Sequence, residues 1–413
     1  MSEVSEATPS RARAIFPLRE VVLGAMLPSL LFSMAVGIVL PLIPSTATRL
    51  GADLAAAGFV AALLPIGKIA ADLPAGAVAA RIGDRRAMLL AAVLSLLAFA
   101  GTAAAPSLLL LQLSIFALGV ATAVFHLSRH AFLTEVTPVG QRARVLSTLG
   151  GMHRLGYFVG PFLGALVIVS TSLRPAFWLA TGCVLVMLIV LLMSRDDTAR
   201  STSGNRAPKR SLLQIAVDYR RLFLTLGVAT LLVGAVRGAR QTVLPLWGES
   251  LGLDPEVISL LFGLSGAVDM LLFYPAGKVM DHWGRLWMAI PSMLLMGVAM
   301  ALLPLTGGAT TVALVACLLG LGNGIGAGII MTIGADVAPV NDRSSFLGVW
   351  RLFSDAGDAA GPLIIAAGAA LGSVAGGIWA SAAVGAMAAG ALGRWVPRYS
   401  EHANRTTRRR AER

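Results

Sequence analysis

Long apolar runs separated by short polar stretches make up most of the chain. Each run is roughly 20 residues long, which is the length that a helix needs to cross the hydrocarbon core of a bilayer. The runs lack the alternation of apolar and polar residues that is typical of the strands of a membrane β-barrel. The pattern therefore predicts an all-α membrane protein with twelve transmembrane helices. The runs cover residues 21–43, 55–79, 87–104, 107–134, 144–170, 175–193, 222–247, 256–280, 287–305, 309–336, 344–370 and 372–395.

A polar segment between the sixth and seventh runs divides the chain into two halves. It is rich in Ser, Arg and Lys, as is typical of a linker. We therefore expect two six-helix bundles joined by this segment. The expected parts are a cytoplasmic N-terminal tail (1–20), an N-terminal six-helix bundle (21–193), a cytoplasmic linker (194–221), a C-terminal six-helix bundle (222–395) and a basic cytoplasmic tail (396–413).

The two halves repeat each other at a constant shift of 201 residues. In the first helix the shift is 204, which implies a length difference of three residues in the first outer loop. The repeat indicates pseudo-symmetric bundles, a layout in which transporters place the substrate site between the repeats. The matches at the constant shift include Gly51 with Gly252, Pro74 with Pro275, Gly83 with Gly284, Glu135 with Asp336, and Gly160-Pro161 with Gly361-Pro362.

Composition agrees with the membrane interpretation. The chain is 56% hydrophobic and 13% charged, whereas soluble domains contain about 25% charged residues. The formal net charge of +12 comes mainly from particular loops, so it points to topology and not to a nucleic-acid partner. Cys183 and Cys317 both fall in apolar runs, so no disulfide framework is implied and the redox compartment stays undetermined.

Basic residues also predict the orientation of the chain. They gather in the N-terminal tail, the loops after the second and fourth runs, the linker and the C-terminal tail, whereas the loops on the other side hold only Arg49 and Arg174. By the positive-inside rule both termini are cytoplasmic, in the plasma (inner) membrane. The first run ends in Pro41-Leu-Ile-Pro44, not in a small-residue cleavage site, so we expect a retained helix. The arginine-rich tail serves as a topology anchor or contacts anionic membrane lipids.

Charged residues inside the apolar runs are the most informative feature. A charge at the bilayer centre costs about 2.5–3.5 kcal/mol on the insertion scale, so such residues face a cavity or pair with one another. They predict a substrate or proton pathway, and Asn323 on the tenth run is a further candidate to bind substrate or a neighbouring helix. The embedded charges are Lys68, Asp72, Arg129, Arg154, Arg237, Arg240, Asp269, Arg351, Asp355 and Asp358.

A loop motif between the second and third runs resembles that of the major facilitator superfamily. Gly76, Arg81, Gly83 and Arg85 match the family motif, but Ala80 stands where the family has Asp. The second-half copy matches better. The resemblance implies a latch that closes the cytoplasmic side of the outward-open state, while the alternative is a tight turn whose arginines set topology. The second-half copy consists of Gly277, Asp281, Gly284 and Arg285.

The fifth run carries a glycine pattern similar to the antiporter motif of the same family. It consists of Gly156, Gly160, Pro161 and Gly164, and together with Pro41-x-x-Pro44 it resembles the twelve-helix drug:proton antiporters. This resemblance implies export. The family's antiporters usually carry an Arg in the outer half of the fourth helix, where this chain has no charge near Ile115. A copy at Gly357 and Gly361-Pro362 leaves a pure packing role open.

The repeat suggests how four embedded charges pair. Lys68 corresponds to Asp269, and Arg154 to Asp355. In the family, helix two packs against helix eleven and helix five against helix eight. We therefore expect two ion pairs between the halves, Lys68–Asp355 and Arg154–Asp269. The alternative is pairing within each half, of Lys68 with Asp72 and of Arg351 with Asp355.

These pairs bear on energy coupling. An Asp that loses its basic partner in a partly desolvated site can take up a proton, so protons are the expected coupling ion. A permanently ionised pair that only aligns the halves is the alternative. His126 and His130 stand four residues apart, but the adjacent Arg129 repels a cation, so a pH-sensing or gating role is favoured over metal binding.

No cofactor or catalytic constellation stands out in the chain. It has no nucleotide-binding Gly-x-x-x-x-Gly-Lys motif and no Ser/His/Asp arrangement, so we expect neither an ATP-driven pump nor an enzyme. We expect a monomeric secondary active transporter that exports small amphipathic or organic molecules by proton antiport and rocker-switch alternating access. The alternatives are an importer of an anionic metabolite, a lipid or glycolipid flippase, and a membrane receptor or scaffold that transports nothing.

Overall fold

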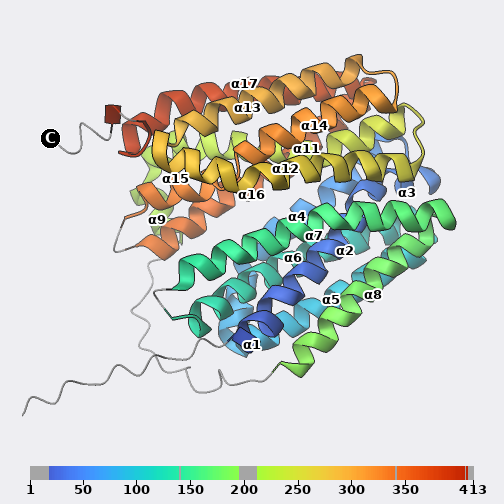
Figure 1. Cartoon of the computed structure of the whole chain (residues 1–413), viewed down its shortest axis with the longest axis horizontal. Coiled ribbons are helices and arrows are strands. Elements are labelled where there is room, and N and C mark those ends of the chain that lie inside the picture. The colour runs from blue at the N-terminus through green and yellow to red at the C-terminus, as the bar shows by residue number, and fades with distance from the viewer. Residues whose placement is uncertain (1–17, 139–140, 195–211, 340–341, 405, 408–413) are drawn as a thin grey trace, which may run out of the picture.

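The computed structural model describes residues 18–138, 141–194, 212–339, 342–404 and 406–407. These residues form helices joined by short turns, and no β-strand occurs among them. Figure 1 shows two groups of helices, with the N-terminal half in blue and green below the C-terminal half in yellow and red. The all-α prediction is confirmed.

The N-terminal half begins with a nearly continuous helical rod. Its α-helical geometry is interrupted by a π-helical turn η1 and, at Pro41, by a 3₁₀ turn η2. Inside this half α2 packs against α7 and α8, and α6 packs against α4 and α5. The elements are α1 (Leu18–Val21), η1 (Val22–Met26), α2 (Leu27–Val39), η2 (Leu40–Leu42), α3 (Ile43–Arg49), α4 (Leu54–Ile82), α5 (Asp84–Ala104), α6 (Leu108–Val136), α7 (Arg142–Ser170) and α8 (Leu173–Met193).

The C-terminal half repeats this plan. Here α11 packs against α16 and α17, and α14 packs against α12 and α13. Its elements are α9 (Leu212–Asp218), α10 (Arg220–Leu222), η5 (Phe223–Gly227), α11 (Val228–Ser250), α12 (Pro255–Trp283), α13 (Leu286–Leu302), η6 (Leu303–Leu305), α14 (Ala309–Ile325), α15 (Ile329–Val337), α16 (Arg343–Ala370) and α17 (Val374–Tyr399).

Helix bounds follow the sequence repeat closely. Adding 201 to the bounds of α4 gives 255–283, which are the bounds of α12. The same shift moves α6 onto 309–337, which is the span from the start of α14 to the end of α15. The internal repeat of the sequence is therefore also a repeat of structure.

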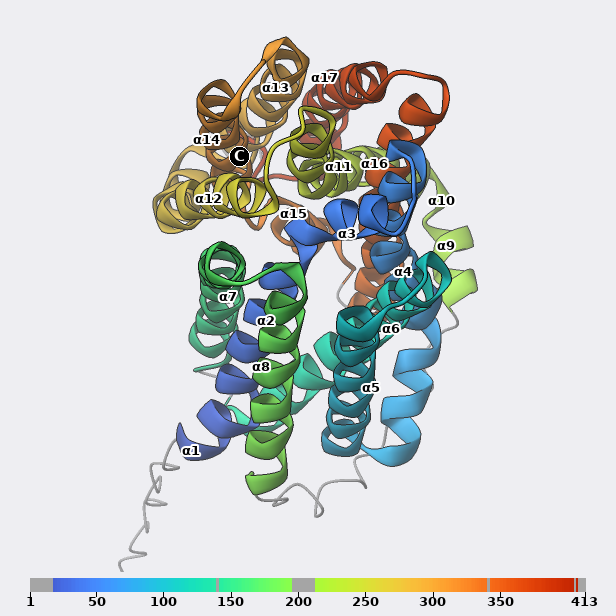
Figure 2. The same ribbon diagram turned by 90° about the vertical axis from the view of Figure 1, so that its right-hand side faces the viewer.

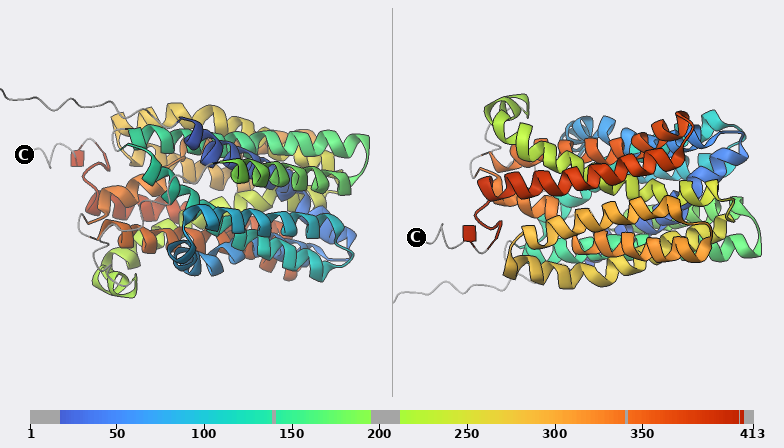
Figure 3. Two further views of the ribbon diagram at one scale, coloured as in Figure 1. Left: turned by 90° about the horizontal axis from the view of Figure 1, so that it is seen from below. Right: turned by 90° about the horizontal axis from the view of Figure 1, so that it is seen from above.

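Both described ends of the chain lie at the same end of the molecule. Figures 1 and 3 place α1 and the C-terminal end of α17 there, and we call this end the terminus side. The turns at 50–53, 251–254 and 371–373 lie at the other end, which we call the opposite side. Residues 1–17, 195–211 and 408–413 lie outside the described residues, so most of the expected tails and linker do too.

Three helical segments differ from the expected runs. Eleven helices in the described residues are long and apolar enough to cross a membrane, and α16 is not among them because Arg351, Asp355 and Asp358 lower its hydropathy. The tenth run is broken, since α14 ends at Ile325 and Gly328 has φ of +79°. Part of the expected linker, α9, is helical and packs against α16.

Two helix pairs form the main contact between the halves, α4 with α16 and α7 with α12. Seen from the opposite side, α3 of the N-terminal half reaches across to α11 (Figure 2). The repeat relates α4 to α12 and α7 to α16, so the two cross-half pairs are pseudo-symmetric equivalents. This is the helix pairing that the family resemblance implied.

Close packing inside each half depends on glycine. A Cβ atom added at Gly119 of α6 would lie 2.1 Å from the carbonyl oxygen of Leu64, and one at Gly67 of α4 would lie 2.2 Å from that of Phe116. The repeat-equivalent Gly320 packs in the same way against Ser265. Small residues let helices approach in a membrane, where lipid provides no hydrophobic driving force between them.

The antiporter-like motif has the same packing geometry. Cβ atoms at Gly156 and Gly160 of α7 would lie within 2.7 Å of the α2 backbone, and Gly164 faces Ile38 at 3.4 Å. In the second half, Gly357 and Gly361 pack α16 against α11 as tightly. Pro161 lies inside α7. The packing interpretation of these glycines is therefore supported in both halves.

We expect Gly119→Ala to lower the unfolding free energy by about 1–3 kcal/mol, because the methyl group overpacks the α4–α6 contact. The thermal unfolding temperature of the purified protein in detergent measures this effect.

Gly182→Ala is the matched control. Gly182 lies inside α8, and a Cβ atom there would have nothing within 4 Å, so the substitution should be neutral or stabilising by up to about 1 kcal/mol. Equal unfolding temperatures for both variants would contradict the packing argument.

Candidate functional site

Four embedded charges lie at the middle of the four helices that join the halves. Lys68 and Asp269 are the central residues of α4 and α12, with fourteen helical residues on either side of each. Arg154 lies two residues from the midpoint of α7, and Asp355 lies close to that of α16. The four charges therefore share one level of the bundle.

Lys68 of α4 pairs with Asp355 of α16 across the two halves. The distance from Lys68 Nζ to Asp355 Oδ1 is 2.6 Å, and the side chains are 17% and 8% exposed. The expected pair is confirmed. Asp355 Oδ2 also accepts a hydrogen bond from Arg351 Nε at 3.2 Å, so the within-half contact of the alternative interpretation is present as well.

Arg351 extends this pair into a network of four residues. Its Nη2 atom lies 3.7 Å from Asp72 Oδ1 on α4, which makes a second charge contact between the halves. Asp72 therefore meets Arg351 of the other half, where the alternative interpretation had paired it with Lys68. One carboxylate, Asp355, interacts with two cations, and Arg351 interacts with two carboxylates.

Arg154 and Asp269 form the second expected pair. Arg154 Nη1 lies 2.7 Å from Asp269 Oδ1, with side chains 21% and 12% exposed. The Arg154 guanidinium also lies over the Phe273 ring, at 4.5 Å from its centroid, which is a favourable cation–π geometry. The repeat relates this pair to Lys68–Asp355, with the positive charge in the N-terminal half both times.

The remaining basic residues of the C-terminal half hold positions within that half. Arg237 of α11 donates to the Gly326 carbonyl at the break between α14 and α15. Arg240 Nη1 donates to Ser265 Oγ at 3.2 Å. Asn323 is buried near the end of α14, three residues before that carbonyl. Arg237 and Asn323 therefore lie at a discontinuous helix, a feature that often marks transporter binding sites.

Asp358 and Arg129 lie outside the two cross-half ion pairs. The Asp358 backbone packs against Gly234 and Gly238 of α11. Arg129 of α6 is buried, with its guanidinium 5.4 Å from the centroid of the Phe125 ring. The sequence grouped both residues with the pathway, and the structure brings neither into the Lys68–Asp355 or Arg154–Asp269 contact.

A ring cluster in the N-terminal half joins two histidines from different helices. His126 of α6 lies 5.4 Å from His153 of α7, ring to ring. His153 Nδ1 is 2.5 Å from Ser33 Oγ of α2, and its ring packs on Tyr157 at 4.8 Å. His130 is exposed. Sequence spacing had grouped His126 with His130, and only the fold shows that His126 faces His153.

No metal site is formed in the described part of the chain. Within it, no three residues among His, Cys, Asp and Glu come together in a way that could hold a metal ion. The His126–His153 cluster lies near Arg129 and Lys68, whose charges repel a cation.

The loop motifs form turns that glycine makes possible. Gly83 has φ of +85° and Gly284 has φ of +106°, a region that side-chain-bearing residues rarely adopt. The tight-turn interpretation is therefore supported in both copies. Gly76 and Gly277 are not tightly packed, Arg81 is exposed, and the Asp281 side chain lies outside the described part of the structure.

The motif arginines reach neighbouring helices of their own half. Arg85 donates to the carbonyl oxygens of Leu191 at 3.2 Å and Ser194 at 2.5 Å, at the end of α8. Arg285 makes a two-point contact with Asp336 of α15, with Nε at 3.0 Å. The sequence had singled out both arginines without identifying either partner.

A further contact joins the two halves at the opposite side, and the sequence patterns did not predict it. Glu249, at the end of α11, accepts hydrogen bonds from Ser45 Oγ at 2.5 Å and Thr48 Oγ1 at 2.6 Å, both on α3. At the 204-residue shift Ser45 is the repeat equivalent of Glu249, so equivalent positions of the two halves meet. That equivalence was the signal available in the sequence.

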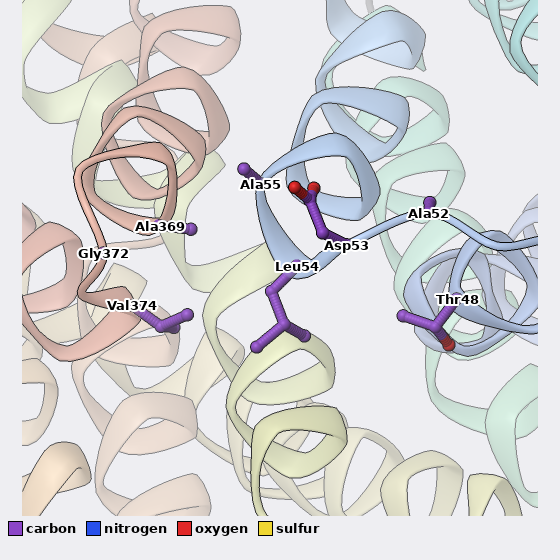
Figure 4. A pocket seen from close by; sticks show the side chains of 8 residues that line it. All are labelled: Thr48, Ala52, Asp53, Leu54, Ala55, Ala369, Gly372 and Val374. Atoms are coloured by element: carbon purple, nitrogen blue, oxygen red, sulfur yellow. The ribbon is translucent and has the colours of Figure 1, made fainter.

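A pocket of about 430 Å³ also lies at the opposite side, between the start of α4 and the turn joining α16 to α17 (Figure 4). Its carboxylate, Asp53, accepts a hydrogen bond from Ala56 N and so caps α4. The pocket is lined mainly by small apolar residues and lies away from the helix midpoints that hold the paired charges. It is therefore not the candidate site.

Two pseudo-symmetric helical bundles, with paired charges at the midpoints of the helices between them, define a membrane transporter of the parallel-repeat type. The family model of the Major Facilitator Superfamily matches residues 25–362 and 226–412, so the match extends over nearly the whole chain. The chain belongs to the Major Facilitator Superfamily.

The relatives of assigned function share only a quarter of their residues with this chain over the matched region. The chain is 25% identical over 256 residues to the multidrug resistance protein MdtH of Salmonella paratyphi B (strain ATCC BAA-1250 / SPB7) and to that of Salmonella newport (strain SL254). The match covers 61% of this chain and 62% of the relatives' own length.

Solved structures show the same fold at low sequence identity. A POT family transporter in complex with 5-aminolevulinic acid superposes with a TM-score of 0.77 at 13% identity, covering 92% of this chain and 96% of that one. The nucleoside transporter NupG superposes with a TM-score of 0.70 at 14% identity, covering 90% and 96%. These similarities support the fold alone.

Exchanging the charges of Arg154 and Asp269 tests the second ion pair. Arg154→Asp and Asp269→Arg should each lower the thermal unfolding temperature, because each places two like charges together, whereas an uncompensated buried charge alone already costs about 3–5 kcal/mol. The double variant should recover most of that loss.

The matched control combines Lys68→Asp with Asp269→Arg, which places like charges together in both pairs and should recover nothing. A correctly exchanged double variant that is no more stable than the sum of its single changes would refute the pairing.

Removing the Glu249 carboxylate tests the contact at the opposite side. In a Cys183→Ala, Cys317→Ala background, spin labels on Arg49→Cys and Ser250→Cys report the distance between α3 and α11. Glu249→Ala removes both hydrogen bonds, so the distance distribution from double electron–electron resonance should gain a longer component.

Asp254→Ala, on the exposed turn after α11, is the control and should leave the distribution unchanged. The same result for Glu249→Ala would show that the contact does not hold the halves together.

Proposed function

We propose that the protein is a secondary active transporter that exports small amphipathic or organic molecules in exchange for protons, by rocker-switch alternating access. The observation that carries this proposal is the pair of repeat-related ion pairs, Lys68–Asp355 at 2.6 Å and Arg154–Asp269 at 2.7 Å, at the midpoints of the helices between the halves. Any rocking of one half against the other acts on these contacts.

Protonation gives these pairs a role in coupling. Separating a buried pair leaves two uncompensated charges, which costs several kcal/mol. A proton that binds the released carboxylate removes one of those charges, so proton binding favours separation. Asp269 and Asp355 are the primary carriers in this scheme, with Asp72 and Asp358 as further candidates.

Two observations support export as the direction of transport. The relatives MdtH are named as multidrug resistance proteins, and the glycine pattern of α7 resembles the antiporter motif. Against export, the embedded charges comprise six basic and four acidic residues, which suits an importer of an anionic metabolite. Import by proton symport is therefore the second candidate function.

We also assign a role to each segment of the chain in this transport scheme. The segments 21–193 and 222–395 act as the two moving bundles, joined by the linker 194–221. The terminus side is cytoplasmic, in the inner membrane, as the basic loops predict. The protein works as a monomer, and its arginine-rich tail contacts membrane lipids.

Proton movement in proteoliposomes tests the proposal. A pH-sensitive dye is enclosed, and a panel of amphipathic carboxylates, neutral molecules and cations is added outside without a pH gradient. Antiport predicts that substrate entry drives protons out, so the interior becomes alkaline. Asp269→Asn should abolish this signal, because the carboxylate can no longer exchange a proton.

Asp254→Asn, on an exposed turn, is the control and should retain the signal. Interior acidification would identify symport and replace the export proposal with import. Absence of any substrate-dependent proton movement across the panel would reject proton coupling.

A further inference from the structure

Arg129 is a buried cation that has no carboxylate partner among the residues that the structure describes. It lies on α6 and is 5% exposed. Within the described part of the chain its Nε and Nη1 atoms have no hydrogen-bond partner. Its guanidinium contacts the Phe125 ring, 5.4 Å from the centroid, and a cation–π contact leaves the N–H groups of a guanidinium unsatisfied.

The surroundings of Arg129 add positive charge. Arg351 of α16 lies close enough to repel it, and the Arg351 side chain is 35% exposed. Arg129 is seven residues from the end of α6 and Arg351 eight from the start of α16, so both lie about 10–12 Å from the terminus-side ends of their helices. The two arginines therefore lie at about the same depth in the bundle.

The nearby carboxylates contact other cations. Asp72 Oδ1 contacts Arg351, and Asp355 contacts both Lys68 and Arg351. The other oxygen of Asp72, Oδ2, is buried and has no hydrogen-bond partner within the described residues. A buried charge without a partner is strongly destabilising, so an anion bound at Arg129 would compensate its charge.

Buried aromatic rings pack beside this cation, since Phe125 is fully buried and Phe32 is 1% exposed. Phe32 of α2 packs on Phe125 at 5.0 Å and on His126 at 6.0 Å. His126 continues the row to His153 and Tyr157, and within the described residues its Nε2 atom is buried without a hydrogen-bond partner. Within the described residues, His126 and Arg129, three residues apart on α6, therefore both carry buried nitrogen atoms that are available to an anion.

We propose that Arg129, with His126 and Arg351, binds the carboxylate or phosphate group of a small organic anion. The inference rests on the proposed transport function and narrows its substrates to molecules with an anionic end. Arg suits this role because its planar donors match the two oxygens of a carboxylate or phosphate.

Calorimetric binding of phenyl phosphate tests the site in the full-length protein. In phosphatidylcholine nanodiscs the wild type should bind phenyl phosphate saturably and discriminate against benzylamine, which has the same ring and the opposite charge. Arg129→Gln should weaken phenyl phosphate binding about tenfold or more, as expected for the loss of a charge-assisted hydrogen bond. Arg129→Lys should lose less, since it keeps the charge.

Arg174→Gln is the control, because Arg174 is exposed at the opposite side, and its dissociation constant should stay within about twofold of the wild type. Unfolding temperature without ligand separates binding from a structural role. Arg129→Met should unfold at the same or a higher temperature than the wild type, because it removes an unpaired buried charge.

The source of the anion is decided by repeating the titration in phosphatidylglycerol nanodiscs. If phosphatidylglycerol weakens phenyl phosphate binding to the wild type but not to Arg129→Gln, the anion is a lipid headgroup. If phenyl phosphate binds the wild type equally well in both kinds of nanodisc, the anion is soluble. The proposal is overturned if Arg129→Gln binds phenyl phosphate as the wild type does, if the wild type binds none, or if Arg129→Met is destabilised. Proton movement driven by a neutral amphiphile does not involve Arg129, so failure here is distinct from failure of the transport proposal.

Discussion

The cost of placing charge inside a membrane-spanning helix is the constraint on which the structure depends. Lys68, Arg154, Asp269 and Asp355 lie at helix midpoints, where an unpaired charge is most expensive. Each finds its partner in the other half, at 2.6 Å and 2.7 Å. The charges therefore make the interface between the halves a requirement of stability, and any movement there changes their electrostatic balance.

Rigid packing within each half complements this charged interface. Gly67 and Gly119 bring α4 and α6 into backbone contact, and Gly156 and Gly160 do the same for α7 and α2. Such contacts allow little sliding, because a displacement of a fraction of an ångström brings backbone atoms into collision. Motion is therefore expected between the halves, where ion pairs and the Glu249 hydrogen bonds can break and re-form.

The two sides of the interface are not electrically equal. In the part of the chain that the structure describes, the α7–α12 contact has one ion pair, whereas the α4–α16 contact links Asp72, Arg351, Asp355 and Lys68 in one network. Arg129 stands close to that network, and its Nε and Nη1 atoms have no hydrogen-bond partner among the described residues. An anion bound at Arg129 would add a negative charge to the α4–α16 network. The charge of the substrate and the proton-accepting carboxylates would then act on the same group of residues.

Much of this was determined by the sequence, because the apolar runs, the repeat and the embedded charges are properties of residue type and spacing. They predicted the helical bundles, and with the family's helix pairing they predicted both cross-half ion pairs. The structure alone decided the His126–His153 contact, the partners of Arg85 and Arg285 and the helix break before Gly328. Each of these depends on which faces of distant helices meet and on local backbone conformation, and a pattern along one chain does not carry that information.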